Sequence, residues 1–399
     1  MKNLKNKNLL IISNGYPNKS GSIVDSTFVK DQVDELSKYF NKIYVLVPTP
    51  YFPKLIFNLG FLKSYKNRLF YKNYKYKNIE VYYTQYFKLP NKLSHREFYG
   101  VKSIVDCISK NKLKFDIIHS HFIWPSGYFG TLIKNKYSKP LIVTGHGFDV
   151  YDFPYRNKFC ENKYKFVLNN CDFFITVSKN NLKIANFFVN LKNKSQIIYN
   201  GFNELFKPMN KKLACKKLKL DINKKILLNV ASYKVNIKNQ INLINAIDLL
   251  RKKRHDFVLY LIGDGPDRQL IIDKIEKLKL KKFIKIIGSK PHSDIPLWMN
   301  ASDLFILPSY FEGNPTVMFE VLGCGVPYIG TSVGGVSNII ISENYGLLFN
   351  NLDNYKKLFE LINIALDKKW NHKEILKYAN NFKLKNIVKK ITNIYNKLN

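Results

Sequence analysis

Phe311–Ile340 reads FEGNPTVMFEVLGCGVPYIGTSVGGVSNII, and this stretch decides the fold of the chain. An apolar run, Leu304–Leu307, comes before it and ends at a Pro-Ser pair. The order predicts a buried strand, then a loop, then a helix. Asn314 is expected to cap that helix and Pro315 to occupy its first position, because proline lacks only an N–H group that would have no partner there.

Two carboxylates lie in this stretch, Glu312 in the predicted loop and Glu320 on the predicted helix. The N-terminus of such a helix offers free backbone N–H groups to an anion such as a phosphate. A carboxylate so near an anion site is expected to bind something else, such as the hydroxyl groups of a sugar. The alternative interpretation is an ordinary strand–helix unit with two solvated carboxylates.

The same alternation of short apolar runs and longer amphipathic segments fills both halves of the chain. Strands are predicted at 9–13, 43–48, 79–83, 117–120 and 141–144, then at 226–230, 257–262, 284–288, 304–307 and 326–330. Helices are predicted at 29–38, 98–110 and 127–135, then at 241–251 and 267–278. Strands that alternate with helices indicate parallel, doubly wound sheets, so the fold class is α/β.

The length of 399 residues exceeds what one ordinary core supports, which predicts two domains. A polar, lysine-rich segment, 200–219, is the expected join. We therefore predict domains at 1–200 and 201–379, followed by a helical segment at 380–399. No apolar run approaches the ~18 residues of a membrane-spanning helix, and the N-terminus lacks a signal-peptide pattern, so a cytoplasmic location is expected.

The net charge and the cysteine content limit the kinds of partner and metal site that the sequence supports. Lys and Arg number 65 against 29 Asp and Glu, a formal net charge of +36. Such a charge suits nucleic acid or anionic lipid, and it equally suits the codon bias of an AT-rich genome, which favours Lys, Asn, Ile and Tyr. The five cysteines form no C-x-x-C pair, which favours reduced thiols over a zinc site. No D-x-D sequence is present to hold a metal-bound diphosphate.

Ligands of open α/β sheets bind at the carboxyl ends of the strands, so two facing sheets would place a cleft between the domains. The segment TGHGFD, 144–149, follows a predicted strand. His146 lies there between two glycines, where an imidazole can donate a hydrogen bond to a sugar hydroxyl or a phosphate. His119 and His121 end another strand without a carboxylate or cysteine to complete a metal site, and they are interpreted as structural or as part of an acceptor pocket.

The order of several segments resembles glycosyltransferase family 4, the retaining, nucleotide-sugar-dependent enzymes of GT-B fold. The matching segments are TGHGFD, ITVS at 175–178, IIYNGFNELF at 197–206, Lys238–Asn239, GDGP at 263–266, GSKPH at 288–292, the Glu312–Glu320 stretch, SVGG at 332–335 and GLLF at 346–349. The resemblance implies two Rossmann-like domains that face a central cleft, with an acceptor-side first domain and a nucleotide-sugar-binding second domain. It also implies a last helix that crosses back to the first domain.

The resemblance implies roles for particular residues. His146 and Glu312 would be the catalytic residues that contact the donor sugar, and Lys238 would neutralise the diphosphate. Glu320 would accept hydrogen bonds from the ribose. The other donor-binding residues would be Gly21, Gly263, Lys290, Gly313, Asn314 and Pro315.

The chain departs from the family pattern at one point of this site. The position of a family arginine holds Ser232 or Tyr233, and Lys234 is the candidate substitute. Lysine and helix N-termini would then stabilise the leaving diphosphate, so neither a metal nor another cofactor is expected.

The implied function is transfer of a hexosyl-type sugar from a nucleotide-sugar to a glycan or lipid-linked acceptor, in cell-surface polysaccharide or glycolipid synthesis. One alternative is a nucleotide-sugar 2-epimerase of the same fold. Another is a basic, non-catalytic nucleic-acid-binding protein, although no nucleic-acid motif is present. A basic and aromatic segment, 54–77, is further predicted to dock the enzyme peripherally on the anionic inner membrane face. The alternative for that segment is a helix packed on its own domain.

Overall fold

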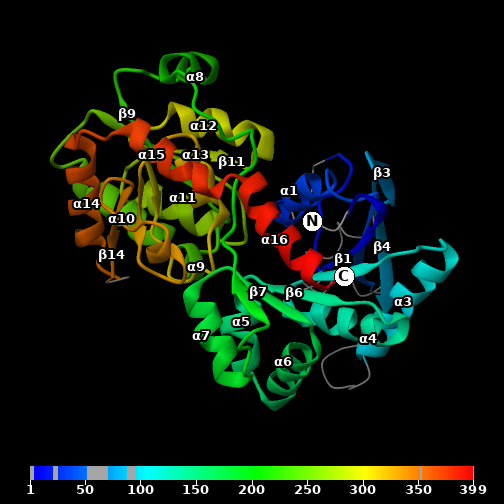
Figure 1. The fold of residues 1–399 in the computed structure, drawn as a ribbon. Helices are drawn as coiled ribbons and strands as arrows, with labels where there is room; N and C mark the ends of the chain where they lie inside the picture. The colour runs from blue at the N-terminus through cyan, green and yellow to red at the C-terminus, as the bar shows by residue number, and fades with distance from the viewer. Residues whose placement is uncertain (1–3, 21–25, 52–70, 88–95, 351–352, 399) are drawn as a thin grey trace. The chain divides into compact units, whose positions relative to one another are not determined.

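The computed structural model describes residues 4–20, 26–51, 71–87, 96–350 and 353–398 (Figure 1). The chain forms two compact units, one of residues 1–199 with 387–399 and the other of residues 200–386. We call them unit 1 and unit 2. Gly21 and residues 54–70 of the predicted membrane-docking segment lie outside the described residues.

Unit 1 is built on an eight-stranded sheet with the order β3-β4-β2-β1-β5-β6-β7-β8. All neighbouring strands pair in parallel except β3, which is antiparallel to β4. The strands are β1 Asn8–Ser13, β2 Lys42–Tyr51, β3 Tyr74–Tyr76, β4 Ile79–Phe87, β5 Ile117–His121, β6 Leu141–Gly145, β7 Phe173–Thr176 and β8 Ser195–Ile197. Strands β5 and β6 are buried along their whole length, as expected of parallel strands covered on both faces.

The helices of unit 1 follow the strands along the chain and bury apolar side chains against the sheet. They are α1 Thr27–Leu36, α3 Arg96–Lys110, α4 Tyr128–Tyr137, α5 Phe148–Tyr151, α6 Lys158–Asn170 and α7 Lys179–Phe188, with short turns η1 Leu4–Asn6, η5 Ile123–Gly127 and η6 Phe153–Tyr155. Asn157 and Ser178 cap α6 and α7 by accepting bonds from backbone N–H groups. The last helix, α16 Leu384–Leu398, begins in unit 2, and from Ile387 onward it belongs to unit 1.

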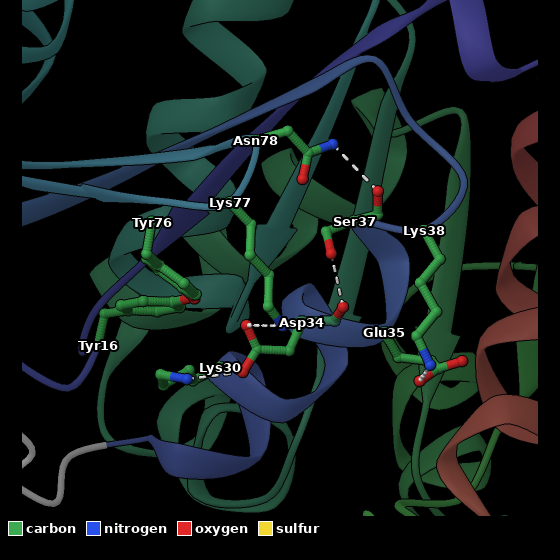
Figure 2. A network of polar contacts seen from close by, with 9 residues as sticks. All are labelled: Tyr16, Lys30, Asp34, Glu35, Ser37, Lys38, Tyr76, Lys77 and Asn78. Carbon is green, nitrogen blue, oxygen red and sulfur yellow. Dashed lines mark hydrogen bonds and ion pairs between the residues drawn. The ribbon is translucent and has the colours of Figure 1, made fainter.

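A polar network ties α1 to the turn between β3 and β4 in unit 1 (Figure 2). Asp34 binds Lys30 at 2.6 Å and lies 3.9 Å from Lys77, and the amide of Asn78 donates to the carbonyl of Ser37. The hydroxyls of Tyr16 and Tyr76 lie 2.8 Å apart, which joins the loop after β1 to β3. Tyr83 and Tyr74 both donate to the carbonyl of Pro17, so this hairpin holds the start of that loop in place.

Unit 2 is built on a six-stranded, entirely parallel sheet with the order β11-β10-β9-β12-β13-β14. The strands are β9 Lys225–Val230, β10 Phe257–Ile262, β11 Ile284–Gly288, β12 Leu304–Leu307, β13 Tyr328–Thr331 and β14 Gly346–Phe349. The chain winds outward from β9 to β11 and then returns to place β12 on the other side of β9. The boundary between β9 and β12 is therefore the topological switch point, where open α/β sheets bind ligands.

The helices of unit 2 are α8 Lys211–Leu218, α9 Val235–Lys238, α10 Gln240–Leu250, α11 Arg268–Lys277, α12 Ile295–Ala301, α13 Thr316–Gly323, α14 Tyr355–Asp367 and α15 His372–Ala379, with turns η7 His292–Asp294, η8 Val336–Asn338 and η9 Asn380–Phe382. The main core lies between β9, β10 and β12 and the inner faces of α10, α11 and α14. Each aliphatic side chain buried completely there contributes about 1.5–3 kcal/mol relative to exposure.

Candidate functional site

The loops at the switch point of unit 2 bring Lys238 and Glu312 together. Lys238 is the last residue of α9, after β9, and Glu312 lies in the loop after β12. The Nζ atom of Lys238 is 2.6 Å from Oε1 of Glu312, and the hydroxyl of Ser309 donates to the same oxygen at 2.6 Å. The side chains are 20% and 8% exposed, so the pair is largely shielded from water. Among the described residues, Oε2 of Glu312 makes no hydrogen bond.

The loop between Glu312 and α13 differs in one detail from the sequence prediction. Helix α13 begins at Thr316, so Pro315 is the N-cap and Asn314 precedes it. Pro315 has an extended backbone, with ψ near 119°, and its carbonyl accepts the bond from Met318. The prediction of Asn314 as N-cap and Pro315 as the first helical residue was therefore wrong by one residue.

Neighbouring loops hold this backbone from both sides. The amide of Asn200 donates to the carbonyl of Asn314 at 2.8 Å, and the N–H of Gly335 donates to the carbonyl of Gly313. Gly334 has φ near +57°, and a Cβ there would lie 1.8 Å from the carbonyl oxygen of Glu312. The SVGG segment is thus a close-packed support for the Glu312 loop, and glycine is required at this position.

Glu320 lies on α13 and meets His292 in the first turn after β11. Its Oε1 atom is 2.9 Å from Nε2 of His292, and Glu320 is buried. The His292 ring packs against Phe206, with centroids 5.1 Å apart. Glu320 thereby faces the loop that carries Lys290, a residue that the resemblance assigned to donor binding. The sequence analysis did not single out His292 as the partner of Glu320.

One further loop of unit 2, GDGP, meets the GSKPH loop that carries His292. The N–H of Gly263 donates to the carbonyl of Gly288, so the GDGP and GSKPH loops touch. Lys290 is half-buried within the second loop. Gly263 has φ near +145°, and a Cβ there would lie 1.9 Å from the carbonyl oxygen of Ala231.

The three residues at and after the position of the missing family arginine, Ser232, Tyr233 and Lys234, differ in burial. Tyr233 is fully buried, and its hydroxyl donates to the carbonyl of Leu261. Ser232 and Lys234 are exposed. Tyr233 is therefore a core residue, and Lys234 is the cationic side chain of this short segment that lies at the surface.

In unit 1, Asp149 organises the TGHGFD loop after β6. Its carboxylate accepts from the backbone N–H groups of His146, Gly147 and Ile123 at 3.0, 2.7 and 2.9 Å. Burial raises the pKa of Asp149 and the three N–H groups act against that rise. These bonds fix the backbone that carries His146, which explains why an aspartate stands three residues after the histidine.

His146 belongs to a cluster of three histidines in unit 1. His121 Nδ1 is 3.1 Å from His146 Nε2, and the rings of His119 and His121 stack at 4.5 Å. His119 is held by the hydroxyls of Tyr395 and Thr144 at 2.6 and 2.7 Å. Burial lowers the pKa of all three histidines, to about 3 for His121. The H-x-H spacing at a strand end was the signal for this cluster, because residues i and i+2 share one face.

Among the residues that the structure describes, no group of three or more His, Cys, Asp or Glu side chains is arranged to hold a metal ion. No described helix is long and apolar enough to cross a membrane.

Comparison with known proteins identifies the class. A family described as "Glycosyl transferases group 1" matches residues 210–382, and one described as "Glycosyltransferase Family 4" matches residues 63–204. An uncharacterised glycosyltransferase of Methanocaldococcus jannaschii is 32% identical over 315 residues, which cover 73% of this chain and 78% of that protein. The Bacillus subtilis glycosyltransferase TuaC, named for teichuronic acid biosynthesis, is 27% identical and covers 85% of each chain.

Solved structures agree on the fold. Sucrose-phosphate synthase from Thermosynechococcus elongatus superposes with a TM-score of 0.78 at 18% identity, covering 98% of this chain and 99% of that one. HepE of Anabaena, solved in complex with UDP-glucose, gives a TM-score of 0.70 at 18% identity, covering 98% of this chain and 100% of that one. The fold is GT-B, with two Rossmann-like domains, and the protein is an enzyme of the hexosyltransferase type. The chain belongs to glycosyltransferase family 4, in the group 1 glycosyl transferases.

Proposed function

We propose that this glycosyltransferase moves a sugar from a nucleotide-sugar donor to an acceptor hydroxyl with retention of the anomeric configuration. The observation that carries the proposal is the Lys238–Glu312 pair at the switch point of unit 2. It places a cation and a carboxylate at the carboxyl ends of adjacent parallel strands, where this fold class binds nucleotides. In the reaction, the bond from the sugar C1 to the donor phosphate breaks, a bond to the acceptor oxygen forms, and the nucleoside diphosphate leaves.

Unit 2 is assigned the donor. Lys238 stabilises the leaving diphosphate, helped by Lys234 at the surface and by backbone N–H groups of Gly313 and Asn314. Glu320, oriented by His292, accepts hydrogen bonds from the ribose hydroxyls. Lys290, Gly263 and Pro315 line the nucleotide side. Glu312 binds sugar hydroxyls through Oε2, because its Oε1 is already engaged by Lys238 and Ser309.

His146 of unit 1 is assigned the donor sugar. Its imidazole is neutral because burial lowers its pKa, so it acts as a hydrogen-bonding group and carries no charge. A neutral hydrogen-bonding group of this kind suits a sugar hydroxyl better than a phosphate. No metal ion takes part in the proposed reaction, because lysine and backbone N–H groups supply the positive potential.

The acceptor is a glycan or a lipid-linked sugar of the cell surface. The name of TuaC supports this class, because that protein is named for teichuronic acid biosynthesis. A nucleotide-sugar 2-epimerase is the rival reaction, and it needs no acceptor. An epimerase also leaves the sugar attached to the nucleotide, so the epimerase and the transferase reactions can be distinguished by their products.

A donor screen followed by product analysis tests the proposal. Thermal shift against nucleoside diphosphates and nucleotide-sugars, with uridine nucleotides first, identifies the donor, since a ligand at a hundred times its Kd stabilises by roughly 2.7 kcal/mol. The transfer product is then examined by NMR for the configuration at C1. An inverted product, or an epimerised nucleotide-sugar formed without acceptor, would overturn the proposal.

We also propose that the segment 54–77 docks the enzyme on an anionic membrane surface. Residues 71–77 of this segment are described, and several of them contact unit 1. Tyr74 bonds to Pro17, Tyr71 stacks on Tyr83, and Lys75 binds Glu80 at 3.1 Å. These contacts favour packing on unit 1 for Tyr71, Tyr74 and Lys75. The residues assigned to lipid are Lys63, Lys66, Arg68 and the exposed Lys72. Their replacement by Glu is expected to abolish salt-sensitive co-sedimentation with anionic vesicles. Binding that ignores salt and lipid charge would exclude the docking role.

A further inference from the structure

The His146 ring is enclosed by three aromatic neighbours in unit 1. Phe28 and Phe122 each lie 4.8 Å from it, and His121 stacks against it at 5.3 Å with the rings almost parallel. One ring nitrogen, Nε2, is taken by His121. The other, Nδ1, is buried and has no hydrogen-bond partner among the described residues. Any hydrogen bond from this imidazole to a ligand must therefore use Nδ1 as long as the ring keeps this orientation.

His121 is itself held rigidly. It is 1% exposed and lies between the rings of His119 and His146. His119 uses both ring nitrogens, one with Tyr395 and the other with Thr144, so it cannot rotate without losing a bond. His121 Nε2 is also buried without a partner among the described residues.

Two neutral proton arrangements satisfy the 3.1 Å contact between His121 Nδ1 and His146 Nε2. In the first, His146 Nε2–H donates, and the second proton sits on His121 Nε2 as a buried N–H without a partner. In the second, His121 Nδ1–H donates, His121 Nε2 keeps a lone pair, and the remaining proton sits on His146 Nδ1. A buried N–H without a partner is rarer and costlier than an unpaired acceptor. Each arrangement leaves one buried N–H without a protein partner, on His121 Nε2 in the first and on His146 Nδ1 in the second. The second places that N–H on the more exposed of the two rings, which is the ring that a bound ligand can pair.

We propose that His121 is a positioning residue that donates its Nδ1–H to His146 Nε2 and thereby places the His146 proton on Nδ1, facing an oxygen of the donor sugar. The bond made by one ring nitrogen sets which atom of the other is protonated. The inference about His146 as the sugar contact rests on the proposed function, while the tautomer itself does not. His119, Tyr395 and Thr144 support the arrangement by fixing the plane on which His121 stacks.

The first test needs no substrate. Protein labelled with ¹⁵N-histidine is examined by NMR at pH 7.5, and the signals of His146 are assigned by their loss in His146→Gln. The expected spectrum has the proton of His146 on Nδ1 and that of His121 also on Nδ1. A His146 proton on Nε2 would overturn the proposal, whatever reaction the enzyme catalyses.

The second test separates positioning from folding. His121→Phe keeps a stacking ring but removes the N–H group that donates the hydrogen bond to His146. His121→Asn keeps an N–H group at the same number of bonds from the backbone as Nδ1. We expect His121→Phe to lower kcat by about tenfold or more with donor KM little changed, and His121→Asn to recover most of it. His255→Gln, at an exposed histidine of unit 2, is the matched control.

The outcomes are distinguishable from failure of the proposed function. If the wild type transfers no sugar but His146 is protonated on Nδ1 and shifts to Nε2 in His121→Phe, the positioning role stands and the proposed reaction fails. If transfer occurs and His121→Phe retains both the wild-type kcat and the wild-type tautomer of His146, the positioning role is excluded.

Discussion

Lys238 Nζ and Glu312 Oε1 lie 2.6 Å apart at the switch point of unit 2, so the cation assigned to the diphosphate and the carboxylate assigned to the sugar form one ion pair. The pair is largely shielded, and shielded charges interact more strongly than surface ones. Under these proposed assignments, an incoming diphosphate competes with Glu312 for Lys238. Loosening of the pair would then accompany donor binding and would couple the nucleotide side of the proposed site to the sugar side.

Glu312→Gln is expected to lower kcat strongly while leaving affinity for the nucleoside diphosphate unchanged or improved. The amide removes the charge that competes for Lys238 and weakens the hydrogen bonds to the sugar. A loss made in the transition state lowers kcat and kcat/KM together. Steady-state kinetics and calorimetry with the diphosphate check this. Glu360→Gln, at an exposed glutamate of the same unit, is the control, and a variant with normal turnover and only a raised donor KM would contradict the assignment.

Glu320→Ala is expected to weaken binding of the nucleoside diphosphate on the order of a hundredfold or more. A hydrogen bond to a charged acceptor contributes roughly 1.5–3 kcal/mol, and the ribose offers two hydroxyls. His292→Ala should have a smaller effect, because it removes the residue that orients Glu320 and leaves the carboxylate in place. Calorimetry measures both. Unchanged affinity in Glu320→Ala, judged against the exposed-site control Glu343→Ala, would remove Glu320 from the nucleotide site.

His146→Ala is expected to reduce turnover more than nucleotide affinity, since the residue is assigned to the sugar and the nucleotide is assigned to unit 2. The same variant also removes the partner of His121, so its stability must be measured in parallel. His146→Gln serves as the conservative comparison. Equal loss of diphosphate affinity and turnover in both variants would argue for a structural role of His146.

Chelation of divalent cations is expected to leave the transfer rate unchanged. The proposed positive potential comes from Lys238, Lys234 and backbone N–H groups, and the chain has no D-x-D sequence. The measurement compares initial rates with EDTA and with added Mg²⁺ or Mn²⁺. Activity that requires either ion would contradict the proposed stabilisation of the leaving group.

Much of unit 2 could be predicted from the sequence because its strands are short apolar runs that end in glycine or polar loops. The strand predicted at 304–307 matches β12, while that at 326–330 starts two residues before β13, Tyr328–Thr331. Pro327 explains the difference, since proline has no N–H to give to the ladder. Strands β3 and β8 of unit 1 were not predicted because they have only three residues each, too few to show a period. The four-residue strands β7 and β14 were not predicted as strands either.

The pairings within the site could not be predicted. Lys238 and Glu312 are 74 residues apart in sequence, and His292 and Glu320 are 28 apart. Only the strand order, which puts β12 beside β9, brings the first pair together. The sequence likewise left open whether Ser232 or Tyr233 holds the position of the family arginine. The burial of Tyr233 follows from packing against the GDGP loop, which no local pattern reveals.

Acid is expected to destabilise unit 1 between pH 7 and pH 5 through the three histidines. Burial holds the pKa of each below its unfolded value of 6.5, to about 3 for His121. The neutral folded forms therefore contribute stability that is complete above about pH 6.5 and is lost as pH falls toward the folded pKa. Each histidine accounts for at most about 2 kcal/mol over this window. Glu80 does not contribute there. Burial raises the pKa of Glu80, but hydrogen bonds from Tyr82, Lys42 and Lys75 outweigh this effect and lower the pKa to about 2. The stability that ionised Glu80 contributes is therefore lost only below about pH 4.5.

Hydrogen exchange of the β5 and β6 amides, corrected for the intrinsic rate at each pH, measures this loss. Among the described residues, Asp149 and Tyr395 are also titratable and lie in or beside the cluster, and burial raises the pKa of both. A raised pKa for Asp149 gives a small gain in acid, opposite in sign to the histidines. His121→Asn removes one buried imidazole and should reduce the loss by about 2 kcal/mol. His255→Gln should leave it unchanged. Equal protection of these strands at pH 7 and pH 5 would show that the histidines charge without cost and would contradict their burial.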